Sequence, residues 1–191
     1  MNQDSSPSND ILVQIQPTPN PNAWKFILDR PVLLEGKSTY LSPQEAELNP
    51  LAAALFQVAG VKQVHFFQNV ITITQTFDAD TEPLQQAVIS VIQTRMAIHN
   101  PALGSAHERK QARNHLPPDL QKIEEILDRT VRPGLQGDGG DITVVKYQDH
   151  KLEVSYEGAC GTCPSSTTGT LMAIESILKD EFDPQIEVVP V

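Results

Sequence analysis

The sequence predicts an α+β fold made of two small domains joined by a flexible linker. A length of 191 residues allows one ordinary domain or two small ones. Each half contains two β-rich runs followed by a helical pattern, and the polar stretch 100–116, with proline and glycine, separates the halves. We therefore expect a disordered N-terminus at 1–10, an N-terminal domain at 11–99, a linker at 100–116 and a C-terminal domain at 117–191.

The N-terminal half begins with strands and ends with a helix. Residues 11–15 read as a short strand, which the proline-punctuated run 17–22 ends. Trp24, Phe26 and Leu28 alternate with other residues, as in a strand with one buried face. The other elements expected here are a strand at 32–34, a helix from Pro50 to Gly60, strands at 61–67 and 70–77 joined by a Gln68-Asn69 turn, and a helix over 81–99.

The C-terminal half predicts the element order α-β-β-α-β. Pro117 and Pro118 open its first helix, which Arg132-Pro133-Gly134 ends. The run 137–141 lacks the acidic series of an EF-hand and the ending of a phosphate loop, so it predicts a glycine-permitted turn into a strand. The expected core is carried by apolar residues of the strands and the second helix: Leu152, Val154, Leu171, Ile174 and Leu178. A last strand is expected at 186–189.

Charge and composition exclude several classes of protein. The formal net charge of −10 repels the phosphates of nucleic acids and anionic membrane surfaces, so we expect neither as a partner. No segment approaches the ~20 consecutive apolar residues that span a bilayer. Residues 1–10 contain no Lys or Arg and match neither a signal peptide nor a transit peptide. We expect a cytoplasmic protein.

The chemistry is concentrated at the two cysteines, Cys160 and Cys163, which are the only ones in the chain. They lie in a glycine-rich loop between a predicted strand and a helix that begins at Pro164. Unpaired N–H groups and the helix dipole stabilise thiolates at such a position. The pair therefore predicts a metal centre or a redox couple more strongly than two buried small residues.

Counting ligands narrows the choice without closing it. Structural zinc and iron–sulfur clusters both normally take four strong ligands, and one chain offers two thiolates, so two chains are needed. None of the five histidines lies at ligand spacing from the thiols, and we expect all five at the surface: His65, His99, His107, His115 and His150. A thiol-disulfide oxidoreductase remains possible, although no aromatic residue precedes Cys160 and a β-hairpin stands where a βαβ unit is expected.

Motifs in both halves resemble one family. Asp138-Gly-Gly-Asp141, Gly158-Ala-Cys-Gly-Thr-Cys-Pro-Ser-Ser166 and Arg132-Pro-Gly-Leu resemble the C-terminal domain of NifU, the Nfu-type iron–sulfur module. Thr18-Pro-Asn-Pro-Asn22 and Asn49-Pro-Leu-Ala52 resemble the N-terminal Nfu domain.

The resemblance implies a homodimer in which Cys160 and Cys163 of each subunit bind one bridging 4Fe-4S cluster; a 2Fe-2S cluster is the alternative. It also implies an upstream cluster-assembly scaffold as donor and apo iron–sulfur proteins as acceptors. Such a protein is a carrier and not an enzyme, and we expect no catalytic residues.

Overall fold

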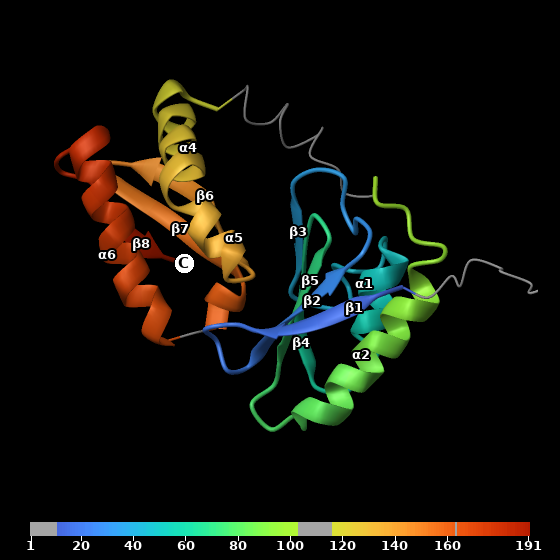
Figure 1. The fold of residues 1–191 in the computed structure, drawn as a ribbon. Coiled ribbons are helices and arrows are strands. Elements are labelled where there is room, and N and C mark those ends of the chain that lie inside the picture. The colour runs from blue at the N-terminus through green and yellow to red at the C-terminus, as the bar shows by residue number, and fades with distance from the viewer. Residues whose placement is uncertain (1–10, 103–115, 163) are drawn as a thin grey trace, which may run out of the picture.

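The chain forms two α+β domains, the fold class that the sequence predicts, and the structure places them side by side (Figure 1). The computed structural model describes residues 11–102, 116–162 and 164–191. The expected disordered N-terminus and most of the expected linker, residues 103–115, lie outside the described residues. Within the described ranges, no helix is both long and apolar enough to cross a membrane.

The N-terminal domain is a five-stranded antiparallel sheet in the order β1-β2-β5-β4-β3, with two helices on one face. Its elements are β1 (Val13–Pro17), β2 (Ala23–Leu28), β3 (Lys37–Tyr40), α1 (Pro50–Leu55), β4 (Val61–Phe67), β5 (Val70–Gln75) and α2 (Thr81–Arg95). Phe26, Phe66 and Ile71 are fully buried, and they pack with the apolar stripe of α2, Leu84, Val88 and Ile92. This layer is the core of the domain.

Local signals explain where most of these elements begin. Asn49 caps α1, because its side-chain oxygen accepts the N–H groups of Leu51 and Ala52, each at 3.2 Å. Gln68 takes a φ of 51° in the two-residue turn between β4 and β5, where the sequence predicts a hairpin. The predicted α1 start, the hairpin and α2 are confirmed.

The predicted strand at 32–34 is wrong. The backbone N–H groups of Val32 and Leu33 both donate to the carbonyl of Gln68, at 2.7 and 2.9 Å, so the chain bends there and pairs with no strand. The strand that the sequence missed, β3, follows Gly36, whose φ is 73°. Its residues Lys37–Tyr40 are polar and carry no apolar alternation, which is why the pattern did not reveal it.

The C-terminal domain is a three-stranded sheet in the order β6-β7-β8, in which β7 and β8 run parallel. Its elements are α4 (Pro118–Thr130), α5 (Arg132–Gly137), β6 (Gly140–Gln148), β7 (Lys151–Gly158), the 3-10 turn η1 (Ala159–Thr162), α6 (Pro164–Glu181) and β8 (Glu187–Pro190). The predicted order is confirmed, with α5 and η1 added. Arg132-Pro133-Gly134 ends α4 but also begins α5, since proline is tolerated in a first helical turn.

The second face of the N-terminal sheet is polar and yet buried. Lys25, Thr72, His65 and Thr39 are paired in register across β2, β5, β4 and β3, so they form one row on the face away from α1 and α2. His65 and Thr72 are each 1% exposed. The C-terminal domain covers this row, which lies between the two domains (Figure 1).

Candidate functional site

Cys160 lies in the turn η1, between the end of β7 and the start of α6. The placement between a strand and a helix that begins at Pro164 is confirmed. The Cys160 side chain is only 7% exposed, and it packs within the core of the C-terminal domain. The sequence assigned the core to apolar residues of the strands and the second helix, but Cys160 of the loop belongs to this core as well. Cys163 lies outside the described residues.

Glycines make the space around this thiol. A methyl group on Gly140 would lie 2.4 Å from Cys160 Sγ and 2.9 Å from its backbone nitrogen, so only glycine fits there. Gly139, with a φ of 81°, turns the chain from α5 into β6, and its carbonyl accepts the Ala159 N–H at 3.1 Å. The predicted glycine turn at 137–141 is confirmed, and it lies directly against the cysteine turn.

The N-terminal domain also contacts the cysteine turn. The side-chain amide of Asn20 donates to the carbonyl of Ala159 at 2.9 Å, and Asn20 is 2% exposed. Lys25 Nζ donates to the carbonyl of Gly137 at 2.6 Å. The immediate surroundings of Cys160 are thus built from both domains.

A cluster of charged and polar side chains surrounds Glu157, near the end of β7 and just before the cysteine turn. Glu157 accepts hydrogen bonds from Thr39 and Thr143, and its carboxylate lies 3.5 Å from Lys37 Nζ and 4.0 Å from His65 Nδ1. Burial acts to raise the pKa of Glu157, but the Lys37 ammonium and the two hydroxyl donors outweigh it and lower the pKa. Glu157 is therefore held as a carboxylate between the domains.

Asp141 extends this cluster into the C-terminal domain. It is 1% exposed and lies 3.2 Å from Lys37 Nζ and 3.5 Å from Arg132 Nε. Burial lowers the pKa of Lys37, although Glu157 and Asp141 oppose the shift. Arg132 also pairs with Glu124 at 2.8 Å, and its guanidinium donates to the Ile142 carbonyl at 3.3 Å. This network fixes the start of β6 beside the cysteine turn.

The histidines differ from the expectation in one case. The prediction of a surface position is wrong for His65, which is 1% exposed because the C-terminal domain covers its strand, and its Nδ1 lies 2.8 Å from Thr39 Oγ1. His99 is half-buried and bonds the Val32 carbonyl at 2.7 Å, while His150 is exposed. His107 and His115 lie outside the described residues.

The structure reveals functional candidates that the pattern did not. Asn20 contacts the cysteine turn, and Lys37 pairs with Asp141 and Glu157 in the charged cluster. In the sequence, Asn20 is a loop residue, and Lys37 and Glu157 look like ordinary polar residues. Two signals were available, because Asn20 and Asp141 belong to runs that resemble family motifs, Thr18-Pro-Asn-Pro-Asn22 and Asp138-Gly-Gly-Asp141. The contact of Asn20 with a turn 139 residues away could not be predicted from the sequence.

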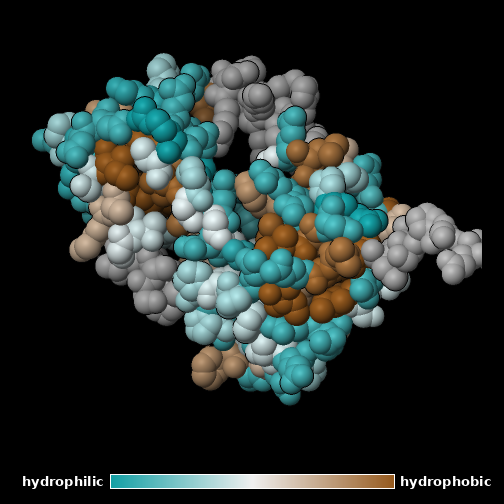
Figure 2. All heavy atoms as spheres, in the orientation of Figure 1, coloured by the Kyte–Doolittle hydropathy of each residue, from teal (hydrophilic) through white to brown (hydrophobic). Residues whose placement is uncertain are grey.

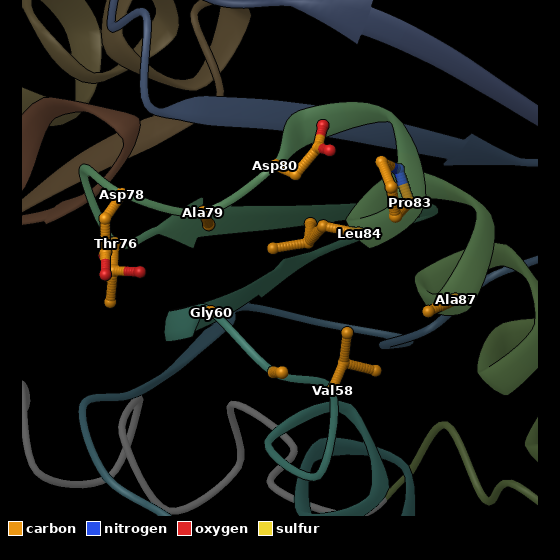
Figure 3. A pocket seen from close by; sticks show the side chains of 10 residues that line it. Val58, Gly60, Thr76, Asp78, Ala79, Asp80, Pro83, Leu84 and Ala87 are labelled. Atoms are coloured by element: carbon orange, nitrogen blue, oxygen red, sulfur yellow. The ribbon is translucent and has the colours of Figure 1, made fainter.

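A separate hollow of about 470 Å³ lies in the N-terminal domain, between the turn at 58–60, the loop at 76–80 and α2 (Figure 3). Its walls include Val58, Gly60, Leu84 and Ala87, and Asp78 and Asp80 lie at its edge. None of its lining residues is a cysteine or histidine, and none belongs to the C-terminal domain. It therefore takes no part in the cysteine site.

Chemically, the described part of the site offers one thiol, backbone N–H groups of a turn and a nearby buried carboxylate. Burial, with the charge of Cys160 as a second cause, raises the pKa of Tyr156 to about 12, so this phenol stays neutral beside the thiol. No group of three or more His, Cys, Asp or Glu side chains suited to a metal ion occurs among the residues that the structure describes. Cys160 supplies one thiolate per chain, so a four-ligand centre needs further ligands besides it.

Comparisons with known proteins define the class first. Residues 123–189 match the NifU-like domain family, and residues 13–99 match the family of the N-terminal domain of the scaffold protein Nfu/NifU. A human protein named "NFU1 iron-sulfur cluster scaffold homolog, mitochondrial" is 31% identical over 96% of this chain and 72% of its own length. A Drosophila persimilis protein of the same name is 34% identical over 94% of this chain, which spans 64% of that relative.

The chain belongs to the Nfu family. The predicted family resemblance is confirmed in both domains. A solution structure of a NifU-like protein from Saccharomyces cerevisiae is 17% identical and covers 51% of this chain and 87% of its own, with a TM-score of 0.45.

The names of these relatives correct one prediction. Both are named mitochondrial, so the cytoplasmic location expected from the sequence is wrong. The expectation rested on composition and on residues 1–10. An address in the cell is read by a receptor and does not follow from the composition of folded domains.

Proposed function

We propose that the protein carries iron–sulfur clusters, with Cys160 and Cys163 of two chains binding one 4Fe-4S cluster at a homodimer interface and passing it to apo-proteins. The observation that carries the proposal is the position of Cys160 on a tight turn, against Gly140, where only a glycine leaves room for the sulfur. The relatives named iron-sulfur cluster scaffold support the same class of cargo.

The ligand count supports the dimer. A cubane cluster takes four thiolates, and each chain supplies two. A cargo that must leave is better held by few ligands from each chain, because a centre enclosed by one chain is released only through partial unfolding. The role of the protein is then to bind and deliver the cluster, with no bond chemistry catalysed on a substrate.

The domain assignment is part of the proposal. Both thiols belong to the C-terminal domain, 117–191, and the N-terminal domain, 11–99, contacts the cysteine turn through Asn20. The linker 100–116 joins them. An upstream assembly scaffold would supply the cluster, and apo iron–sulfur proteins would receive it.

The test is metal and sulfide analysis of the full chain after anaerobic purification and reconstitution. We expect about four irons and four sulfides per dimer, and Mössbauer spectra of a cubane. About two irons and two sulfides would indicate a 2Fe-2S centre. Zinc without sulfide would indicate a structural zinc site, and a reversible intrachain disulfide without metal would indicate an oxidoreductase; either result would overturn the proposal.

The ligand assignment is tested by Cys160→Ala and Cys163→Ala. By symmetry, each removes two of the four thiolates of a dimer, so we expect loss of stable cluster binding and of transfer to an apo-acceptor. Met172→Ala is the matched control, because Met172 is a 69% exposed sulfur residue on α6 that is not a proposed ligand. If a cysteine variant retained iron at the level of Met172→Ala, that cysteine would not be a ligand.

A further inference from the structure

The loop at 18–22 of the N-terminal domain forms one wall of the space around Cys160. A crevice of about 40 Å³ is lined by Pro19 and Asn20 from this loop and by residues of the C-terminal domain: Leu135, Asp138, Ala159, Cys160 and Thr170. The contact between loop and turn includes one buried hydrogen bond, from Asn20 Nδ2 to the carbonyl of Ala159 at 2.9 Å. Ala159 directly precedes the proposed ligand.

The loop is built so that Asn20 points in one direction. Its side-chain oxygen accepts the N–H of Asn22 at 3.0 Å, and its backbone N–H donates to Thr18 Oγ1 at 3.1 Å. The single hydroxyl proton of Thr18 has two carbonyl acceptors within reach, those of Asn20 and Ala23, each 2.9 Å from Oγ1. Because the side-chain oxygen is fixed within the loop, the side-chain nitrogen is aimed across the domain interface at the cysteine turn.

In this closed arrangement, the space that the described residues leave beside Cys160 is too small for a cluster. A crevice of about 40 Å³ holds roughly three waters, at about 10–15 Å³ each. A cubane contains four irons and four sulfides, and a dimeric site also brings a second chain to the same thiol. A cluster therefore reaches Cys160 only when the loop at 18–22 moves away from the turn.

The interface between the domains is of a kind that opens. Figure 2 shows hydrophobic surface gathered over each domain separately, with a largely hydrophilic seam between them on the face in view. In the part of the chain that the structure describes, three polar side-chain atoms have no hydrogen-bond partner and are buried on the face of the N-terminal sheet away from α1 and α2: Gln63 Nε2, Thr72 Oγ1 and Thr74 Oγ1. Each such group costs free energy that is recovered when water reaches it, so docking is weaker than its contacts suggest.

We propose that Asn20 is a positioning residue that holds the Cys160 turn in a closed form, and that the cluster enters and leaves from an open form in which the loop at 18–22 has separated from the turn. The part that concerns the cluster rests on the proposed function. Access to the Cys160 thiol can be measured without any cluster. An experiment can therefore contradict the closed form without contradicting the carrier function, and the reverse.

The experiment measures the rate at which iodoacetamide alkylates Cys160 in the full apo-chain, in a Cys163→Ser background where Cys160 is the single thiol. Asn20→Asp is the decisive variant, since a carboxylate still accepts the Asn22 N–H but cannot donate to Ala159. We expect alkylation about three- to tenfold faster than in the parent, as for loss of one buried hydrogen bond.

The matched control is Asn69→Asp. Asn69 Nδ2 also donates to a backbone carbonyl, that of Leu28 at 2.8 Å, but it lies in the hairpin between β4 and β5. We expect the parental alkylation rate. If Asn20→Asp and Asn69→Asp alkylate at the same rate, the side chain of Asn20 does not control access and the proposal is wrong.

A second variant guards against loss of folding. Lys25→Met removes the donor to Gly137 from the same seam, and because that bond is exposed we expect only about a twofold increase. Circular dichroism confirms that each variant is folded. If Asn20→Asp unfolds, Lys25→Met decides the proposal: a rate equal to that of the control overturns it.

Reconstitution of chains with both cysteines separates the two proposals. We expect Asn20→Asp to take up iron and sulfide faster than the parent, with the same final amount. Faster alkylation with no iron uptake in any chain would leave the closed form standing and overturn the carrier function. Normal iron uptake with an unchanged alkylation rate would support the carrier function and overturn the closed form.

Discussion

The two domains play different roles in the hydrogen bonds between them, because one supplies donors and the other supplies acceptors. In the bonds recorded between the described parts of the domains, the N-terminal domain supplies the donors: Asn20 Nδ2, Lys25 Nζ, Lys37 Nζ and Thr39 Oγ1. The C-terminal domain supplies the acceptors: the carbonyls of Gly137, Ile142 and Ala159 and the Glu157 carboxylate. The same contrast holds for charge, with Lys37 facing Asp141 and Glu157.

This difference shows why the domains dock without merging. Each has its own apolar core, and the contact between them is polar, so it is specific in geometry and reversible in energy. The backbone acceptors lie at the end of α5, near the start of β6 and in the cysteine turn, at Gly137, Ile142 and Ala159. The N-terminal domain therefore contacts the cysteine turn and its neighbouring elements by donating hydrogen bonds to backbone carbonyls of the C-terminal domain.

The largest expected effect breaks one core and leaves the other. Leu178 is fully buried in the C-terminal core, and Leu178→Ala should lower the free energy of unfolding of that domain by about 4 kcal/mol. Urea unfolding followed by residue-resolved NMR should show little change in the N-terminal core, for example at Phe26. Equal losses in both domains would mean that they unfold as one unit.

Removing the shared cation should weaken the seam next. Lys37→Met leaves Asp141 and Glu157 without their partner, and we expect a loss of about 3 kcal/mol in unfolding free energy. The double variant Lys37→Met/Glu157→Gln should lose less than the two single variants summed, because Glu157 no longer carries an unpaired charge. Additive losses in urea unfolding would show that the pair does not interact.

A smaller effect is expected from filling the space beside the thiol. Gly140→Ala places a methyl group 2.4 Å from Cys160 Sγ and 2.8 Å from the Glu157 carbonyl, and should destabilise the C-terminal domain by about 2 kcal/mol. Gly134→Ala is the matched control in α5, since nothing lies within 4 Å of its added methyl group, and should stabilise by about 0.5 kcal/mol. Thermal melts of the two variants should therefore shift in opposite directions.

The smallest expected effect is a pH dependence of the seam. The pKa of Glu157 lies below its ordinary value of 4.5 in the folded protein, so its carboxylate contributes stability above pH 4.5, and this contribution is lost as the pH falls through the lowered pKa. Lys37 and His65 face it from the N-terminal domain, and Thr143 from its own. The difference in unfolding free energy between the parent and Glu157→Gln should close as the pH is lowered; a gap that stays constant would contradict the role of its charge.

Much of the fold is a local property of the sequence. Alternation of residues such as Trp24, Phe26 and Leu28 specified a strand, the stripe Leu84, Val88 and Ile92 specified a helix, and Pro164 specified where α6 begins. The cysteine spacing and the glycines around it were equally local, and they pointed to the thiol site and the family before any contact was known.

Only the tertiary structure decided which residues distant in the sequence contact one another. The polar strand β3 has no apolar period of its own, and it is a strand because Lys37 and Thr39 pair with β4 and bond the other domain. His65 looks like a surface residue in the sequence but is buried, because a second domain covers its face of the sheet. Asn20 meets Ala159 across 139 residues of chain, a contact fixed by domain docking and by no periodicity in the sequence.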